Sequence, residues 1–237
     1  MRIVIIGGGI AAVYMANRIK ILASDTDVLI LSEEAYSPYD RIHLCALVDN
    51  SATLEEISLP VDPTVQIALN EKITSIDRRS KRVFSEHSVF SYDKLIIATG
   101  SVPQTLFDIS TLNNAAVFRN ANDCRKIAEG IGEREVVIVG SGPIGLELMD
   151  TLNKMPSVKH ITLLVRSDAL YDKRLSPQAI RVMESSYLKG GKITISYEDG
   201  IVDKVINDDE ITLLKTKKHE NDYPLLMFGV WKKTKQH

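Results

Sequence analysis

Cysteine is scarce in this sequence of 237 residues, where only Cys45 and Cys124 occur. Two distant cysteines cannot form the multi-bridge framework of a small secreted domain or a four-cysteine zinc site. His43 and His160 also have no partners at metal-ligand spacing, so we predict no metal site. A protein held to nucleic acid mainly by phosphate contacts is excluded, because 29 basic residues face 31 acidic ones.

Long hydrophobic runs are also missing. No apolar stretch approaches the roughly 18 residues that a transmembrane helix needs. The apolar run at the N-terminus is interrupted by three glycines, which is untypical of a signal peptide. We therefore expect a cytoplasmic protein with neither a membrane nor a nucleic acid as its partner; the sequence leaves its oligomeric state open.

The chain repeats itself, because Gly7 corresponds to Gly140, 133 positions later. Each copy has an apolar run, a glycine turn, a helical segment and a second apolar run. In the first copy these lie at residues 2–6, 7–9, 10–23 and 28–31, and in the second at 136–139, 140–142, 143–152 and 161–164. Unbroken apolar runs are typical of strands buried on both faces of a parallel sheet. Each half is therefore predicted to be strand, turn, helix and strand.

The fold class that follows is α/β, with two doubly wound, Rossmann-like dinucleotide-binding domains at residues 1–112 and 113–237. Short β-like runs at residues 65–76 and 81–85 predict an antiparallel β-meander in the first domain. Turn-forming residues at 112–114 suggest a linker. Further predicted elements are a helix capped by Asn122 or Asp123 and ending near Glu129, a helix at 177–188 capped by Ser176, and a hairpin of 201–206 with 211–214.

Glycine turns between a strand and a helix allow the backbone to approach a pyrophosphate, which the free N–H groups of the helix then bind. One such turn is weak evidence, since it is often only a tight turn, but two in register are much stronger. The residues predicted to bind cofactor are Gly7, Gly8, Gly9, Ile10, Ala11 and Ala12 in the first turn and Gly140, Gly142, Pro143, Ile144 and Gly145 in the second.

The end of the second strand carries a different residue in each copy. Glu33 can accept hydrogen bonds from a ribose 2′-OH, as in FAD, whereas Arg166 can pair with a 2′-phosphate, as in NADP. The alternative is that both are ordinary surface charges, with Asp168 close enough to neutralise Arg166. The sequence leaves the choice between NADH and NADPH open.

Three signatures carry a resemblance to a known family: the first turn at residues 7–12, the segment Ala98-Thr99-Gly100 with the three residues that follow it, and the second turn at 140–147. With them the chain resembles the flavoprotein pyridine-nucleotide oxidoreductases, the group with two dinucleotide domains that includes rubredoxin and ferredoxin reductases. Residues 38–44 look most like the N-terminal flavin part of NADH-dependent assimilatory nitrite reductases.

This resemblance implies FAD on the first domain and NAD(P)H on the second. The chain would then pass hydride from NAD(P)H to FAD and electrons onward to an acceptor protein or domain, either a redox protein or of the nitrite-reductase type. The resemblance further implies that Arg41, Ala98, Thr99, Gly100 and the backbone of Ile73 contact FAD. It places Glu147, the one predicted catalytic residue, near the nicotinamide and the flavin.

Two alternatives remain open in the sequence. The likeness stops near residue 230, before the second flavin motif of the relatives, so we expect the N-terminal two-thirds of such a protein. The rival function is a nucleotide-binding remnant without turnover. Cys45 lies close to the place of a redox cysteine in one branch of the family, but it also suits a small buried apolar residue, as Cys124 does.

Overall fold

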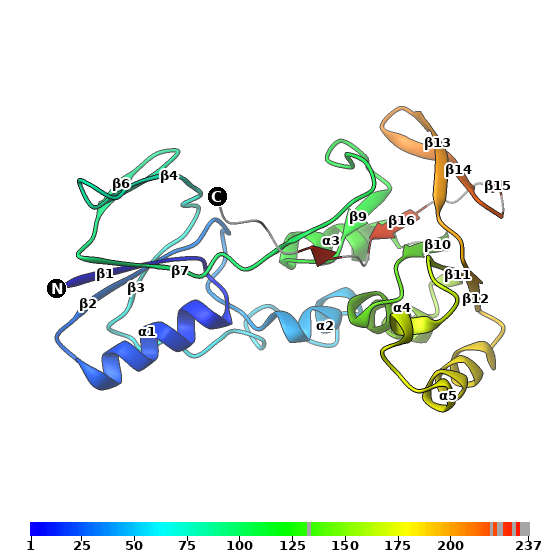
Figure 1. Ribbon diagram of the computed structural model, residues 1–237, viewed down its shortest axis with the longest axis horizontal. Helices are drawn as coiled ribbons and strands as arrows, with labels where there is room; N and C mark the ends of the chain where they lie inside the picture. Colours follow the sequence, from blue (N-terminus) through cyan, green and yellow to red (C-terminus); the bar gives the residue numbers. More distant parts are fainter. Residues whose placement is uncertain (132–133, 219, 222–224, 229–230, 233–237) are drawn as a thin grey trace. The chain divides into compact units, whose positions relative to one another are not determined.

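The computed structural model describes residues 1–131, 134–218, 220–221, 225–228 and 231–232 (Figure 1). The chain forms two compact units, which are described separately below. Unit 1 comprises residues 1–43 and 52–101, and unit 2 comprises residues 44–51 and 102–237. Among the described residues, no helix is both long and apolar enough to cross a bilayer.

Unit 1 is built on a parallel sheet of four strands in the order β3-β2-β1-β7. These strands are β1 (Arg2–Ile6), β2 (Asp27–Leu31), β3 (Gln66–Ala68) and β7 (Lys94–Ile97), and α1 (Ile10–Leu22) connects the first two. A second, antiparallel sheet consists of β4 (Ile73–Asp77), β5 (Arg82–Ser85) and β6 (Val89–Ser91). Figure 1 shows α1 on one side of the parallel sheet and β4 and β6 on the other.

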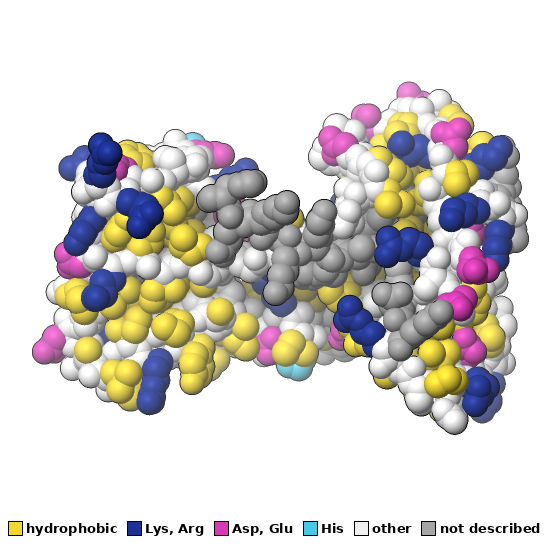
Figure 2. Space-filling model, viewed as in Figure 1, with side chains coloured by type: hydrophobic (Ala, Val, Ile, Leu, Met, Phe, Trp, Pro, Cys, Tyr) yellow, Lys and Arg dark blue, Asp and Glu magenta, His cyan; other side chains and the backbone are white. Residues whose placement is uncertain are grey.

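Both faces of this parallel sheet are covered, which explains the unbroken apolar runs. Ile5 and Ile30 pack with Val13 of α1, whereas Ile6 and Leu31 pack with other side chains on the opposite face. Successive residues of a strand point to opposite faces, so both alternating sets must be apolar. Other apolar side chains reach the surface of unit 1, and Figure 2 shows a group of them over α1: Ile10, Tyr14, Ile21 and Leu22.

Unit 2 contains a parallel sheet of five strands in the order β12-β11-β10-β16-β9. The strands are β9 (Ala115–Val117), β10 (Arg134–Val139), β11 (Val158–Val165), β12 (Ile193–Tyr197) and β16 (Leu225–Phe228). Its longer helices are α3 (Ala121–Gly130), α4 (Pro143–Lys154) and α5 (Pro177–Leu188). An antiparallel sheet is formed by β13 (Ile201–Asn207), β14 (Glu210–Thr216) and β15 (Glu220–Asn221).

The remaining elements are short. They are η1 (Arg41–His43), α2 (Leu44–Val48), η2 (Leu170–Lys173) and the antiparallel pair β8 (Val102–Pro103) and β17 (Trp231–Lys232).

The two units repeat one another in register. Ile6 of β1 pairs with Leu31 of β2, and Val139 of β10 pairs with Leu164 of β11, so both pairs keep the offset of 133 residues. In each unit an antiparallel sheet also lies, in chain order, just before the last strand of the parallel sheet: between β3 and β7 in unit 1 and between β12 and β16 in unit 2. The repeat therefore extends beyond the part that the sequence revealed, since a hairpin alone was expected at residues 201–214.

Three predicted details are wrong, the third of which is described in the next paragraph. Residues 65–76 are not one antiparallel run, because β3 pairs in parallel with β2 and only β4 joins the antiparallel sheet. The N-cap of α3 is Asn120 and not Asn122 or Asp123. The Asn120 side chain accepts from the Asp123 N–H, while the Asp123 carboxylate accepts from the Asn120 N–H. This capping box satisfies two N–H groups that a helix start leaves open.

The third concerns the expected linker at residues 112–114, which is built into unit 2. The buried Asn114 side chain donates to the carbonyl oxygen of Ile211 and accepts from its N–H, each over 2.8 Å. The amide of Asn114 thus substitutes for one rung of a backbone ladder, and Leu112 beside it is buried in the core.

Candidate functional site

The first glycine turn follows β1 and is packed tightly on two sides. Gly7 has a positive φ of +116°, and a Cβ placed there would lie 2.2 Å from the carbonyl oxygen of Ala98. A Cβ on Gly8 would lie 2.5 Å from the Oγ of Ser32. A Cβ on Gly9 would meet no atom within 4 Å. Gly7 and Gly8 are therefore required by the protein itself, whereas the space beside Gly9 is open for a ligand.

The helix that starts at this turn has unsatisfied donors at its N-terminus. Gly9 is the N-cap of α1 and supplies no side-chain cap. Within the described chain, the backbone N–H groups of Gly9, Ile10 and Ala11 donate to no protein atom. Ala12, the last residue of the predicted motif, is fully buried instead. Free N–H groups and the positive end of the helix dipole form a ready site for a phosphate group.

The second turn, between β10 and α4, has matching features. Gly140 has a φ of +107°, and Gly142 is the N-cap of α4, with open space at its Cβ position. Pro143 occupies the first turn, where its missing N–H costs nothing. A Cβ on Gly145 would lie 2.0 Å from the carbonyl oxygen of Gly140, so only glycine allows the helix to pack this closely on the strand.

Among the described residues, the N–H groups of Gly142 and Ile144 have no protein acceptor. The turn thus offers donors to an anion as the first one does. Open space at the third residue, uncapped N–H groups and close backbone packing all fit the pyrophosphate of a dinucleotide at both turns.

The residues at the ends of the second strands are exposed. Glu33 lies two residues beyond β2, and Arg166 directly follows β11. Both side chains are accessible to a ligand that lies at the neighbouring turn.

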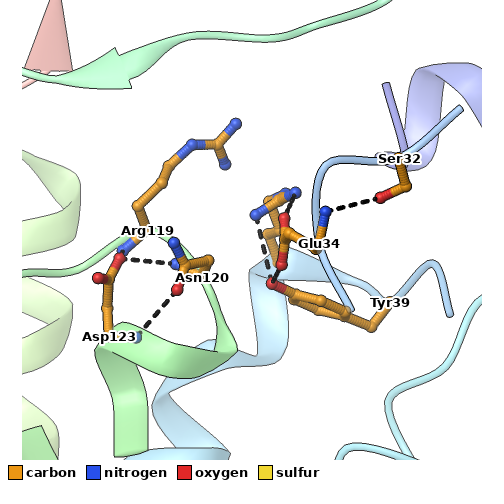
Figure 3. Close-up of polar contacts among 7 residues, drawn as sticks. Ser32, Glu34, Tyr39, Arg119, Asn120 and Asp123 are labelled. Carbon is orange, nitrogen blue, oxygen red and sulfur yellow. Dashed lines mark hydrogen bonds and ion pairs between the residues drawn. The ribbon is translucent and has the colours of Figure 1, made fainter. Parts of the chain in front are cut away.

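Arg41 lies in η1 and belongs to what we call the Glu34 cluster, formed by Glu34, Tyr39 and Arg41. The Oε1 atom of Glu34 accepts from Nη2 of Arg41 over 2.5 Å, and Oε2 accepts from the Tyr39 hydroxyl (Figure 3). Nη1 of Arg41 donates to the same hydroxyl over 3.4 Å. The sequence pointed to Arg41 by its resemblance, but it did not predict that Glu34 and Tyr39 hold it.

The other predicted FAD contacts lie near the end of β7 and in β4. The Ala98 N–H donates to the carbonyl oxygen of Ile6 over 2.8 Å, which holds this segment beside the first turn. Thr99 is exposed, and Gly100 has a φ of +73°, a conformation that favours glycine. Ile73 begins β4 and packs against the core of unit 1. Its backbone therefore belongs to the antiparallel sheet, whereas the first turn follows β1 of the parallel sheet.

Glu147, the predicted catalytic residue, lies on α4 of unit 2, and its side chain is exposed. It lies beside Cys45 of α2. Burial raises the pKa of the Cys45 thiol to about 11, and the nearby carboxylate of Glu147 contributes to the rise. Burial likewise raises the pKa of Cys124 to about 12. Because the thiolate is the reactive form, a raised pKa keeps the Cys45 thiol mostly protonated near neutral pH.

Comparison with known proteins identifies the family. The family model described as pyridine nucleotide-disulphide oxidoreductase matches residues 1–237. The chain belongs to this family. Its members are FAD-dependent NAD(P)H oxidoreductases, so the predicted family and its cofactors, FAD and NAD(P)H, are confirmed.

Three curated relatives illustrate the range of the family. Terpredoxin reductase of a Pseudomonas species is 29% identical over 179 residues, which are 73% of this chain and 43% of the relative. Rubredoxin-NAD(+) reductase of Pseudomonas putida is 32% identical over 158 residues, 62% of this chain and 41% of the relative. Nitrite reductase [NAD(P)H] of Bacillus subtilis is 24% identical over 225 residues, 91% of this chain and 28% of the relative. The chain therefore spans less than half the length of these relatives.

Solved structures share the fold. The covalent putidaredoxin reductase–putidaredoxin complex matches with a TM-score of 0.83 at 22% identity, over 96% of this chain and 58% of that chain. The water-forming NADH oxidase of Lactobacillus brevis bound to NADH matches with a TM-score of 0.83 at 17% identity, over 96% of this chain and 53% of that chain. At these identities the comparison establishes the α/β fold alone.

Proposed function

We propose that this chain supplies the dinucleotide-binding part of a flavoprotein that passes hydride from NAD(P)H to FAD. In this proposal it contains two doubly wound dinucleotide-binding domains, and the first carries a β-meander. FAD binds to the part predicted as residues 1–112 and NAD(P)H to the part predicted as residues 113–237. By packing, residues 44–51 and 102–112 belong to unit 2.

The observation that carries the proposal is the pair of matching turns. Each one follows a strand of a parallel sheet, β1 in unit 1 and β10 in unit 2, begins with a glycine of positive φ and leads into a helix whose N-terminus has no side-chain cap. A single glycine turn of this kind has structural explanations, but a repeat in which the donors and the open space recur is typical of two dinucleotide sites.

Different residues bind different parts of the two cofactors. In unit 1 the N–H groups of Gly9, Ile10 and Ala11 bind the FAD pyrophosphate, and the Glu33 carboxylate accepts from the ribose hydroxyls. In unit 2 the N–H groups of Gly142 and Ile144 bind the pyrophosphate of NAD(P)H. FAD, when bound, supplies the chemistry of hydride acceptance, and the protein supplies position and exclusion of water.

Glu147 has the one catalytic role that the resemblance implies, next to the nicotinamide. Its exposed carboxylate suits a group that orients the cofactor by accepting hydrogen bonds. Hydride transfer itself needs no protein acid or base, because the cofactors supply that chemistry.

Electrons then pass to a redox protein or to a nitrite-reductase-type acceptor. The names of the relatives support both classes, since terpredoxin reductase and rubredoxin reductase stand beside a nitrite reductase. The nitrite reductase matches 91% of this chain, against 73% and 62% for the other two relatives, which favours an acceptor of the nitrite-reductase type. The other two relatives have higher sequence identities, which favours a redox protein as the acceptor.

The test is spectroscopic. The purified chain is incubated with FAD, freed of excess by gel filtration and examined for the visible flavin bands, which are then followed after anaerobic addition of NADH or NADPH. We expect bound flavin whose bands bleach when the nicotinamide is added. Flavin that binds but does not bleach would support a binding protein without turnover. A chain that retains no flavin would contradict the proposal.

A further inference from the structure

The Glu34 cluster holds the guanidinium of Arg41 from several directions. Besides the two hydrogen bonds to Glu34 and Tyr39, the guanidinium lies over the Tyr39 ring, 5.2 Å from its centroid. The Arg41 and Glu34 side chains are only 25% and 16% exposed. An arginine held by these contacts loses little further conformational entropy when it binds a ligand, because its side chain is already ordered in the folded protein.

The cluster rests on a rigid support. The Tyr39 side chain is buried, and its backbone forms a β-bridge with Ser58. The Glu34 N–H donates to the Oγ of Ser32 over 3.3 Å (Figure 3). Ser32 is also the residue that packs directly against Gly8. One buried serine therefore links the cluster to the first glycine turn, which is where a dinucleotide would bind.

We propose that Glu34 is a positioning residue that orients Arg41 toward the pyrophosphate of FAD. This inference rests on the proposed function. The pyrophosphate carries the charges of FAD near neutral pH, and a guanidinium binds such a group through directed, paired N–H donors. Because the Glu34 carboxylate offsets the charge of Arg41, the arginine contributes mainly the direction of its hydrogen bonds. Its contribution should then depend on Glu34.

The dependence is measured by a double-mutant cycle on FAD affinity. The dissociation constant of FAD is obtained from flavin fluorescence for the unchanged chain of 237 residues and for Glu34→Ala, Arg41→Ala and the double variant. We expect each single change to weaken binding about tenfold, the effect of losing a charge-assisted hydrogen bond. We expect the double variant to bind no more weakly than Arg41→Ala, since Glu34 acts through Arg41.

Two further variants separate positioning from general stability. Glu34→Gln keeps an oxygen acceptor for Arg41 and should restore FAD affinity to within about threefold of the unchanged protein. Asp27→Ala removes an ion pair with Arg2 in the same unit, where the atoms are 3.4 Å apart, and should leave FAD affinity unchanged. Thermal unfolding without FAD is recorded for every variant, so a loss of fold is distinguished from a loss of binding.

The outcomes distinguish this inference from the proposed function. If the unchanged protein binds no FAD, the proposed function fails. If it binds FAD but Glu34→Ala binds equally well, or the two single effects multiply in the double variant, only the positioning role is overturned. Should Glu34→Ala not fold, Tyr39→Phe replaces it in the cycle. Its weakening of FAD binding must then vanish in the Arg41→Ala background.

Discussion

A Cβ on Gly145 would lie 2.0 Å from the carbonyl oxygen of Gly140, whereas real Cβ atoms essentially never show such contacts below 3.0 Å. The register-equivalent residue in unit 1 is Ala12, whose methyl group is fully buried. The two turns therefore share a backbone path but differ in how closely the helix approaches the strand. The third glycine of the motif is a packing requirement in unit 2 and not in unit 1.

We therefore expect Gly145→Ala to destabilise the protein by about 1–3 kcal/mol, the usual cost of forcing an extra methyl group into a packed site. Chemical denaturation measures the change in the free energy of unfolding. Ala12→Gly is the matched control, because it removes a methyl group at the equivalent place and should cost about 1 kcal/mol or less beyond the intrinsic helix penalty of glycine. Equal stability of Gly145→Ala and the unchanged protein would refute the packing role.

Gly9 provides the opposite case. Its Cβ position is open and its φ is −92°, so the folded chain itself accommodates a side chain there. We expect Gly9→Val to fold with nearly unchanged thermal stability, apart from about 1 kcal/mol for a poorer N-cap. FAD binding should fall at least about tenfold, because the valine occupies the space that the pyrophosphate needs.

The measurement for Gly9→Val pairs a melting curve without ligand with a titration of FAD. The equivalent change in unit 2, Gly142→Val, serves as the control, since it also enters open space and should impair NAD(P)H binding instead. Unchanged FAD affinity in Gly9→Val would remove the first turn from the flavin site.

The parallel cores of both units were predictable, because a strand covered on both faces must be apolar at every position. This signal located β1, β2, β10 and β11 and fixed the offset of the repeat. The signal fails for shorter elements. β3 has three residues and β15 has two polar ones, so neither carries a period from which a strand could be inferred.

The glycine turns could likewise be predicted from the sequence, whereas the residues that pack against them could not. A glycine pattern indicates where the backbone comes close to another group, but it does not identify that group. Gly8 packs against Ser32, and Ser32 accepts a hydrogen bond from the Glu34 N–H. Both contacts depend on how two loops approach one another in the folded chain. The N-cap of α3 was predicted wrongly for a related reason. Asn120, Asn122 and Asp123 are all residue types that cap helices, and only the backbone geometry selects Asn120.

The two thiols should be unreactive in the folded protein. Their pKa values of about 11 and 12 leave little thiolate at pH 8, so we expect reaction with a disulfide reagent to be slow until the chain is unfolded in denaturant. A raised pKa in the folded state stabilises the fold fully below the unfolded value of 9.0. That stabilisation is lost as the pH rises through about 11 for Cys45.

The free energy of unfolding should therefore decline above pH 9 more steeply in the unchanged protein than in Cys45→Ala. Both proteins contain the same lysines and tyrosines, so the titration of these groups cancels in the difference between their free energies of unfolding. Rapid labelling of Cys45 at pH 8 in the native chain would contradict the raised pKa of its half-buried thiol and would support a redox role.

The choice of nicotinamide cofactor depends on the exposed Arg166. A charged hydrogen bond to a 2′-phosphate is worth about 1.5–3 kcal/mol, or roughly tenfold to a hundredfold in affinity. A packing glycine such as Gly145 touches no 2′ group and cannot discriminate directly. We expect the chain to bind both NADH and NADPH, with any preference for NADPH residing in Arg166. Paired titrations of both nucleotides against the unchanged protein and Arg166→Ala test this.

In these titrations Arg166→Ala should weaken NADPH binding and leave NADH binding within about twofold, because only NADPH offers the phosphate. Asp168→Ala is the informative companion variant. If Asp168 offsets the charge of Arg166, its removal should strengthen NADPH binding and not NADH binding, since a carboxylate near a phosphate is repulsive. A preference for NADPH that survives Arg166→Ala would mean that another group reads the 2′-phosphate, and Arg166 would then be an ordinary surface charge.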